Sequence, residues 1–371
     1  MPIIFTLLFI AITIQLIDYC YHLKEVKAIR LLPPVKTVRQ AKILLKPFRP
    51  KPFDALLGPL QMLAAWLMMI AAILAAWKAQ RFWIDLCVIW IIASQLRRLE
   101  ELSHMAIHGS LGGPRKLAFC CADLFFQLPL LKPDAITRQF RHCVLHHPNV
   151  NLKAKDPGLH DFIEIGFIPG ITQIKFWLCL FYYFTPQGLA SRIKGILSHL
   201  QSDFSHPPRL FARWATMACT TLPFLIAGWW YGFLMFYLLP VLIVFPQFYW
   251  ISQIVEHRWF EEVESLDPIS REMKSCRRTD YTGFLGQFIA VSFFPVGDRF
   301  HMAHSLFPPL RWNYLPAIDA LMKRSLSEYS ANESNQLFFE SNGQPSAISH
   351  LKQIMLKKEN QYDEYCRAQR G

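Results

Sequence analysis

The 371-residue chain has few charged residues, and acidic residues are the scarcer kind. Charged side chains make up 18% of the sequence, with 27 Asp and Glu against 39 Lys and Arg. A typical soluble domain has about 25% charged residues, so the composition argues against a soluble protein. The scarcity of acids also argues against a soluble di-iron bundle, which uses several Glu ligands.

Several motifs that would indicate other functions are missing. The nine Cys are scattered, odd in number and contain no CxxC pair, so we interpret them as reduced, small hydrophobic residues. The HExxH motif of zinc proteases is absent, because Met105 stands where it has Glu. The net charge of +12 is accompanied by no nucleic-acid-binding motif, and we expect no nucleic-acid partner.

Long apolar runs are present instead, and they indicate an integral membrane protein. A membrane-spanning helix needs about 20 mostly apolar residues. Five runs approach or reach that length: Ile3–Tyr19, Ala55–Trp77, Phe82–Leu96, Ala212–Trp230 and Tyr231–Ile251. We therefore predict an all-α integral membrane protein with four to five transmembrane helices. The first run lacks a basic start and a small-residue cleavage site, so we expect a retained span rather than a signal peptide.

The distribution of positive charge predicts the orientation of the chain. Residues 21–53 contain nine Lys and Arg but a single acid, Glu25, which is typical of a cytoplasmic loop. The third run then returns to the cytoplasm near Arg97, and the last two runs form a second hairpin that ends before His257. We predict a cytoplasmic helical cap on a protein of the lipid bilayer, in the inner membrane of a bacterium.

Histidine is concentrated in short groups close to or downstream of the ends of apolar segments. Eight of the 13 His belong to these groups. Neutral imidazole binds Zn, Cu, Fe and Ni, and histidines four apart on a helix, such as the first pair, share one face. Groups of this kind on one side of the membrane predict a metal site formed by His104, His108, His142, His146, His147, His257, His301 and His304.

The spacing within the second group predicts how its imidazoles divide between ions. We expect His142 and His146, four residues apart, to bind one ion together. His147 points about 100° away from His146 on a regular helix. Because Pro148 disfavours the α conformation at the residue before it, we expect the helix to end at His147, which is then free to reach a second metal.

Two metal ions are the smallest number that fits the histidine groups, since eight imidazoles exceed what one six-coordinate ion can bind. Iron suits an all-histidine oxidative site best. A metal transporter or metal sensor is an alternative of another class, but transport sites lie near the bilayer midplane and these groups lie outside the apolar runs. Among the other histidines we expect His22 and His350 to be solvated, while His160, which follows the second group, is an additional candidate ligand.

The order of the groups resembles the membrane fatty acid desaturase and hydroxylase superfamily over roughly residues 55–320. Residues 142–147, followed by Asp156-Pro157, resemble the family's second histidine box. His301-Met-Ala-His304-Ser-Leu-Phe-Pro308 resembles its third box, and Gln253-x3-His257 is similar to an element after the last span. Three boxes in the family's order are a strong indication of the superfamily and a weak indication of the substrate.

The chain departs from the family pattern at Ser305. The third box normally ends in two adjacent histidines, and Ser305 occupies the second of these positions. Gln253, His160 and Glu256 are candidates to fill the coordination position that this leaves.

The resemblance implies the cofactor, the reaction and the partners. It implies two Fe2+ ions bound by the eight grouped histidines, O2 as co-substrate, and a fatty acid or acyl lipid as substrate. The electron donor would be a separate ferredoxin- or cytochrome-like protein with its reductase, because the chain has no fused HPGG cytochrome signature. The implied reaction is oxidation of an unactivated C–H bond, foremost desaturation. Hydroxylation and oxidative decarboxylation to a terminal alkene are alternatives on the same fold.

The apolar runs and the resemblance together divide the chain into three segments. Residues 1–54 form a transmembrane helix and a basic cytoplasmic loop, residues 55–320 a desaturase-like di-iron membrane domain, and residues 321–371 a polar cytoplasmic tail. Acids near the groups could hold imidazole N–H groups: Asp156, Glu100 and Glu101. Five arginines could bind a substrate head group or an acidic electron donor: Arg138, Arg141, Arg258, Arg299 and Arg311.

Overall fold

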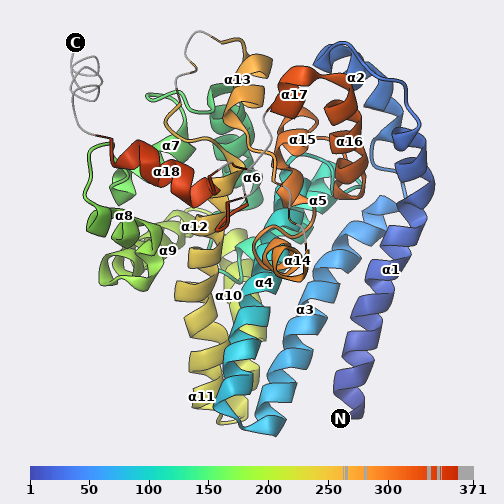
Figure 1. The fold of residues 1–371 in the computed structure, drawn as a ribbon. Coiled ribbons are helices and arrows are strands. Elements are labelled where there is room, and N and C mark those ends of the chain that lie inside the picture. Colours follow the sequence, from blue (N-terminus) through green and yellow to red (C-terminus); the bar gives the residue numbers. More distant parts are fainter. Residues whose placement is uncertain are drawn as a thin grey trace.

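The regular elements of the described residues are helices, which confirms the all-α prediction. Figure 1 shows long helices at one end of the molecule, here called the membrane region, and shorter helices gathered above them, here called the cap. Within the described residues, the β-type pairing is an isolated antiparallel bridge between His257 and Cys276. The computed structural model describes residues 1–261, 263, 266–279, 281, 283–331, 336–340, 343 and 345–357.

Three described helices are long and apolar enough to cross a membrane: α1 (Pro2–Arg30), α3 (Asp54–Ala79) and the continuous helical segment Trp230–Glu256. That segment comprises α11 (Trp230–Phe233), two π-helical stretches (Leu234–Leu238 and Pro240–Val244) and α12 (Phe245–Glu256). The other two predicted spans correspond to α4 (Phe82–Ile107) and α10 (Pro207–Ile226), which are not among the three. The count of four to five spans therefore stays a prediction.

The basic segment that follows the first apolar run was expected to be a loop. Its first residues are instead part of α1, which continues to Arg30. His22 was expected to be solvated, but it is buried. Its Nε2 lies 2.9 Å from the Asp54 carboxylate, and its Nδ1 lies 2.7 Å from the Asp18 carbonyl oxygen. The Asp18 carboxylate in turn accepts a hydrogen bond from Arg311 at 2.7 Å. These buried contacts join α1 to α3 and to the segment after the third histidine box.

Helix α4 connects the membrane region to the histidines. Its 26 residues make it about 39 Å long at 1.5 Å per residue. The first half is apolar, whereas the second half is buried and carries Glu100, Glu101 and His104. The helix continues past Arg97, near which the sequence predicts the return to the cytoplasm, and the position of that return stays a prediction. Arg97 itself is fully buried.

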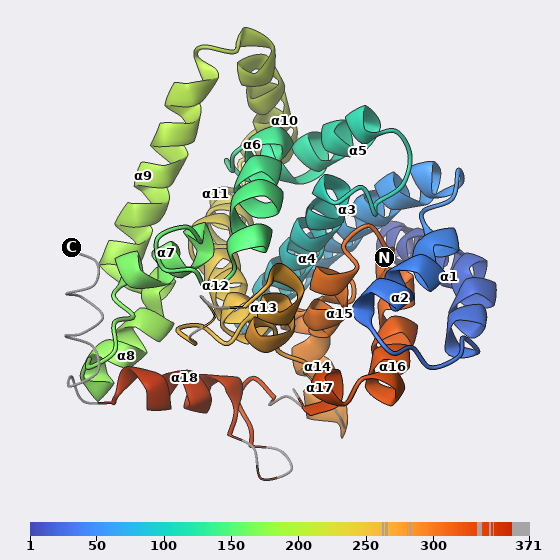
Figure 2. The same ribbon diagram turned by 90° about the horizontal axis from the view of Figure 1, so that it is seen from above.

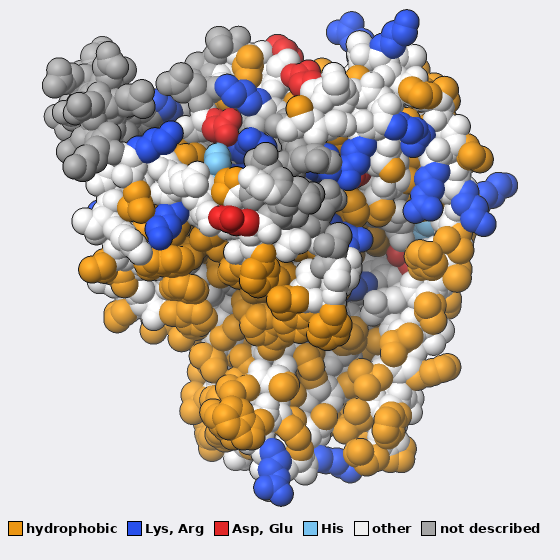
Figure 3. Space-filling model, in the orientation of Figure 1, with side chains coloured by type: hydrophobic (Ala, Val, Ile, Leu, Met, Phe, Trp, Pro, Cys, Tyr) orange, Lys and Arg blue, Asp and Glu red, His pale blue; other side chains and the backbone are white. Residues whose placement is uncertain are grey.

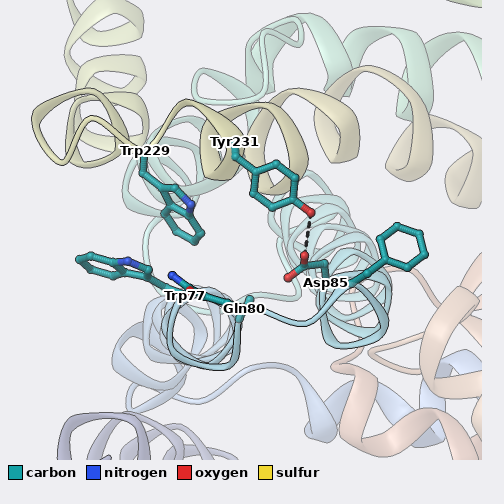
Figure 4. A pocket seen from close by; sticks show the side chains of 7 residues that line it. Trp77, Gln80, Asp85, Trp229 and Tyr231 are labelled. Carbon is teal, nitrogen blue, oxygen red and sulfur yellow. Dashed lines mark hydrogen bonds between the residues drawn. The ribbon is translucent and has the colours of Figure 1, made fainter.

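Two hairpins meet at the end of the membrane region that lies away from the cap. Trp77 stacks on Trp229 with ring centroids 5.6 Å apart. The Tyr231 hydroxyl donates a hydrogen bond of 2.7 Å to the buried Asp85 carboxylate, as Figure 4 shows. Because a buried carboxylate is costly without a partner, this bond helps to fix the turn between α3 and α4 against the turn between α10 and α11.

Shorter helices build the cap and its rim. Figure 2 shows α9 and α10 as a hairpin that projects from one side. Figure 3 shows hydrophobic side chains covering the end with the long helices, while charged side chains gather over the cap. This division fits a protein embedded in a membrane. The further helices are α2 (Val38–Leu45), α5 (Arg115–Ala122), α6 (Ala135–Gln139), α7 (Pro157–Ile165), α8 (Gln173–Leu180), α9 (Pro186–Asp203), α13 (Pro268–Ser275), α14 (Gly283–Phe293), α15 (His301–Leu306), α16 (Leu315–Ser325), α17 (Ser327–Ala331) and α18 (Ala347–Met355).

Part of the expected C-terminal tail packs on the cap. Tyr329 of α17 is fully buried, and its hydroxyl donates a hydrogen bond of 2.8 Å to Asp319 of α16. His350 of α18, expected to be solvated, is half-buried and lies 2.7 Å from a guanidinium nitrogen of Arg277. Residues 358–371 of the predicted tail lie outside the described residues.

Candidate metal centre

Four imidazoles from two segments converge in the first cluster, which we define as His104, His108, His142 and His147. The Nε2 atom of His104 lies 2.7 Å from that of His142 and 3.0 Å from that of His108. The Nε2 atom of His147 lies 3.3 Å from that of His108. The four residues thus present nitrogens that a single ion could bind.

His304 of α15 lies against the first cluster. Its ring centroid is 4.7 Å from that of His104 and 4.8 Å from that of His108. The side chain is buried, and neither ring nitrogen has a hydrogen-bond partner among the described residues. Buried polar groups without a partner are rare in proteins, so the position of His304 fits a further metal ligand.

Three imidazoles form the second cluster, which we define as His146, His257 and His301. The Nε2 atom of His257 lies 3.1 Å from that of His146 and 3.3 Å from that of His301. His257 directly follows α12, and His301 begins α15. Residues distant in the sequence are therefore brought together, and the eight predicted histidines lie in or beside one of two adjacent clusters.

The division between the clusters differs from the sequence prediction, which paired His142 with His146. Residues 140–146 form a π-helix rather than an α-helix, and the His147 N–H donates to the carbonyl oxygen of His142, five residues earlier. In a π-helix such residues share a face, so His147 joins His142 and His146 turns to the other cluster. Pro148 does not move His147 out of the helical region, because His147 has φ −52° and ψ −45°. The π-helix nevertheless ends at His146, a separate 3₁₀ helix begins at His147, and the two histidines face different clusters as expected.

Carboxylates occupy the outer nitrogens of four imidazoles. A carboxylate at Nδ1 accepts the ring N–H and so fixes the proton there, which leaves the Nε2 lone pair free to bind a metal. The pairs are His104–Glu101 at 3.1 Å, His146–Asp156 at 2.7 Å, His147–Glu272 at 3.0 Å and His301–Asp298 at 3.4 Å.

The converging nitrogens fit a pair of bound cations. Facing lone pairs repel each other unless a positive ion lies between them. Two nitrogens bound at right angles to one ion, with bonds of about 2.1 Å, are about 3.0 Å apart. The observed Nε2 separations run from 2.7 to 3.3 Å. Burial lowers the pKa well below the usual range and favours the neutral, metal-binding form for His104, His108, His142, His257 and His304.

His146 owes its orientation to the sequence Asp156-Pro157-Gly158. Asp156 is the N-cap of α7, and its Oδ1 accepts the Gly158 N–H at 2.8 Å as well as the hydrogen bond from His146. Proline suits the first position of a helix. A Cβ atom on Gly158 would lie 3.3 Å from Nδ1 of His146, so only glycine allows this close approach without displacement. Burial acts to lower the pKa of His146, but the Asp156 carboxylate outweighs it and raises the pKa.

Asp156→Asn should weaken metal binding while preserving the helix cap. Asparagine caps helices as well as aspartate does, but it lacks the charge that orients and polarises His146. Loss of such an outer partner typically lowers metal affinity about 10- to 100-fold. Titration of the purified protein with Co2+ measures the change. Asp134→Asn is the control, because Asp134 caps α6 and should leave the affinity unaltered. Wild-type affinity in Asp156→Asn would contradict the supporting role.

Arg97 lies behind both clusters, and it was not among the candidate site residues selected from the sequence. Its guanidinium is fully buried. Two of its carboxylate partners, Glu101 and Asp298, accept the ring N–H of one histidine in each cluster. The arginine therefore holds groups that orient ligands of both ions. Its carboxylate partners are Glu100 at 3.0 Å, Glu101 at 2.8 Å and Asp298 at 2.9 Å.

The additional candidate ligands have different positions. His160 is exposed on α7 and pairs with Glu164 at 3.1 Å, so it joins neither cluster. The Gln253 amide donates a hydrogen bond of 2.6 Å to the Tyr249 hydroxyl, and Gln253 faces the same cavity as several of the grouped histidines. Glu256 lies within reach of one ion together with His301. Gln253 and Glu256 thus remain candidates on geometric grounds.

Two of the five selected arginines face the clusters. A cavity of about 100 Å³ beside the histidines is lined by Arg138 and Arg141, but not by Arg258 or Arg299. Arg311 is fully buried in the contact with α1 described above. It is therefore unavailable to a lipid head group, and that expectation was wrong.

A larger apolar cavity lies in the membrane region. Its volume is about 560 Å³, and its walls come from α3, α4, residues 124–130, α10 and the turn after it, and the segment Trp230–Glu256. The lining includes Trp66, Ile92 and Phe236, and it ends on α4 at Leu96, directly before Arg97. Small-molecule sites in proteins typically have volumes of about 300–1,000 Å³ with mostly apolar walls, so the space suits a hydrocarbon chain.

Comparison with known proteins assigns the family. The family model described as fatty acid desaturase matches residues 82–334, about two thirds of the chain, including all eight grouped histidines. No curated protein was found that matches the sequence. The three apolar helices described above support placement of such a protein in a membrane. The chain belongs to the fatty acid desaturase family.

Proposed function

We propose that this protein binds two iron ions, one at each cluster, and uses O2 to desaturate a fatty acyl chain. The family supports oxidation of a fatty acyl substrate by a desaturase-like enzyme. The observation that carries the two-metal centre is the convergence of Nε2 atoms in two adjacent groups. Iron would supply the activation of O2 and the removal of hydrogen from an unactivated C–H bond.

The protein's own residues prepare both binding sites before an ion arrives. The first ion would be held by the first cluster together with His304, and the second by the second cluster. At four of the eight histidines a carboxylate at Nδ1 accepts the ring N–H, so that the Nε2 lone pair of these four would face an ion. Glu272 is one of them: burial acts to raise its pKa, but its contact with His147 outweighs this and lowers it. The supporting carboxylate is therefore ionised at neutral pH.

The surroundings of the clusters support a lipid substrate. The apolar cavity between the membrane helices offers space for an acyl chain. The small cavity beside the histidines carries Arg138 and Arg141, which pair with Glu100 and Asp161 and could exchange these partners for an anionic head group. We place the clusters on the cytoplasmic side of a bacterial inner membrane, where a separate ferredoxin- or cytochrome-like donor would supply electrons.

Hydroxylation and oxidative decarboxylation to a terminal alkene form the second candidate function. Ser305 replaces a histidine of the family's third box. The second cluster has three imidazoles, whereas five lie at the first. An ion with fewer protein ligands has more open coordination positions. We therefore keep hydroxylation and oxidative decarboxylation as candidate reactions beside desaturation.

Expression in a bacterium tests the proposal. Mass spectrometry of the lipids, free fatty acids and headspace volatiles should show new unsaturated acyl chains, whereas hydroxy acids or volatile alkenes would favour the second candidate. His146→Ala removes a ligand and should abolish the product. An unchanged lipid profile with iron and a reductant supplied would count against the proposal. Reversible Zn2+ binding without O2-dependent turnover would favour a transporter or sensor.

A further inference from the structure

One histidine of the second cluster has sulfur where other histidines have a carboxylate. The Sγ atom of Cys276 lies 3.5 Å from Nδ1 of His257, whose Nε2 faces the other two imidazoles of the cluster. Cys143 lies in a similar position beside the first cluster, with its Sγ atom 3.6 Å from Nδ1 of His108. Cys276 is the more deeply placed of the two cysteines, because it is fully buried.

The backbone fixes Cys276 opposite His257. The two residues form the isolated antiparallel bridge, in which the Arg277 N–H donates to the carbonyl oxygen of Glu256 at 3.1 Å. Cys276 is also the C-cap of α13, and its N–H donates to the carbonyl oxygen of Glu272 at 2.9 Å. Main-chain bonds on both sides of Cys276 thus fix its backbone opposite His257, and the short side chain places the sulfur beside Nδ1.

The thiol also contacts a residue that serves the other cluster. The Cys276 S–H donates to Oε2 of Glu272 over 3.2 Å, and Oε1 of the same carboxylate lies 3.0 Å from Nδ1 of His147. A continuous series of hydrogen bonds therefore runs from His257 through Cys276 and Glu272 to His147. It joins one histidine of each cluster on the side away from the converging Nε2 atoms.

A neutral thiol suits this position better than a carboxylate would. Two buried carboxylates in contact repel each other, and one of them then takes up a proton, so an acid at position 276 would compete with Glu272. The sulfur of Cys276 lies within hydrogen-bond reach of both Nδ1 of His257 and Oε2 of Glu272. The sulfur thus accepts the His257 N–H while its own proton goes to Glu272.

We propose that Cys276 is a positioning residue for the second metal site, where its sulfur replaces a carboxylate as the Nδ1 partner of His257 and links that histidine through Glu272 to the first cluster. The inference rests on the proposed two-metal centre.

Full-length protein in detergent, titrated with Co2+, tests the role of Cys276. Cys276→Ala should retain the ion of the first cluster and lower the affinity for the second about 10- to 100-fold, because His257 loses its Nδ1 partner. Cys276→Ser keeps a hydroxyl that can accept and donate, and should restore most of the affinity. Cys179→Ala is the matched control, since Cys179 is another buried cysteine whose thiol donates to the Ile165 carbonyl oxygen.

The cobalt spectra separate a supporting sulfur from a metal ligand. Thiolate bound to Co2+ gives an intense charge-transfer band in the near ultraviolet, and we expect the wild type to lack it. A band that is present in the wild type and lost in Cys276→Ala would overturn the proposal, as would equal Co2+ affinities of these two proteins. Wild-type protein that binds no Co2+ would contradict the metal centre itself, together with this inference.

Discussion

Arg97→Met will remove metal from both clusters and abolish oxidation of the substrate. The buried guanidinium compensates three buried carboxylates, two of which, Glu101 and Asp298, orient histidines. Removing one partner of a buried ion pair typically costs about 3–5 kcal/mol, because the remaining charge is left unpaired. Without Arg97 these carboxylates must take up protons or move apart, and a protonated carboxyl no longer fixes the imidazole tautomer.

Metal content per chain and thermal unfolding in detergent measure the effect of this substitution. Arg98→Met is the control, since Arg98 occupies the next position on α4 and donates to the amide oxygen of Gln61. Arg97→Lys restores the charge but not the fork of donors that arginine offers, so we expect a partial loss of metal. Retention of both metal ions by Arg97→Met, with wild-type thermal stability, would show that the carboxylates do not need this arginine.

The histidines could be predicted because their signal is local. Short spacings such as that of His301 and His304 are visible in the sequence, and the order of the groups along the chain is enough to indicate the family. The apolar runs likewise predict helices, since backbone groups in lipid must be satisfied within the segment. The all-α fold and the convergence of the histidine groups followed from these two signals.

The supporting residues could not be predicted, because their contacts are distant in the sequence. Arg97 and Asp298 are 201 positions apart, and nothing near either residue indicates the other. Charge alone was equally uninformative about location. Arg311 and His22 carry the polar groups expected at a surface, yet both are buried against the carboxylate of Asp18 or Asp54. Only the packing of α1 against the cap decides their environment.

The division of the second histidine group failed for a different reason. The prediction assumed an α-helix, in which His142 and His146 share a face. A π-helix adds one residue to each turn and has no reliable signature in a single sequence. The insertion moves His147 next to His142 and turns His146 towards His257. The local backbone, rather than the choice of residues, thus decides which ion each histidine serves.

Double substitutions will distinguish the two ways of dividing the second histidine group. In the structure, His142 and His147 belong to the first cluster. Changing both to Ala should leave about one metal ion per chain, because residues of one site are not independent. Changing His146 and His147 instead damages both clusters and should leave almost none. The α-helical arrangement predicts a different pattern. Replacing His142 and His146 would then leave one ion, and replacing His142 and His147 would leave none.

Metal analysis of the three double variants, with each single variant beside them, decides between these arrangements. Turnover cannot do so, since every variant lacks a ligand and should be inactive if O2 activation requires both ions. If the variant with both His142 and His147 replaced retains one ion, and the variant with both His142 and His146 replaced retains none, the histidines are divided as the π-helix places them. The reverse result would mean that the segment adopts an α-helix once metal is bound, since only that geometry returns His146 to the side of His142.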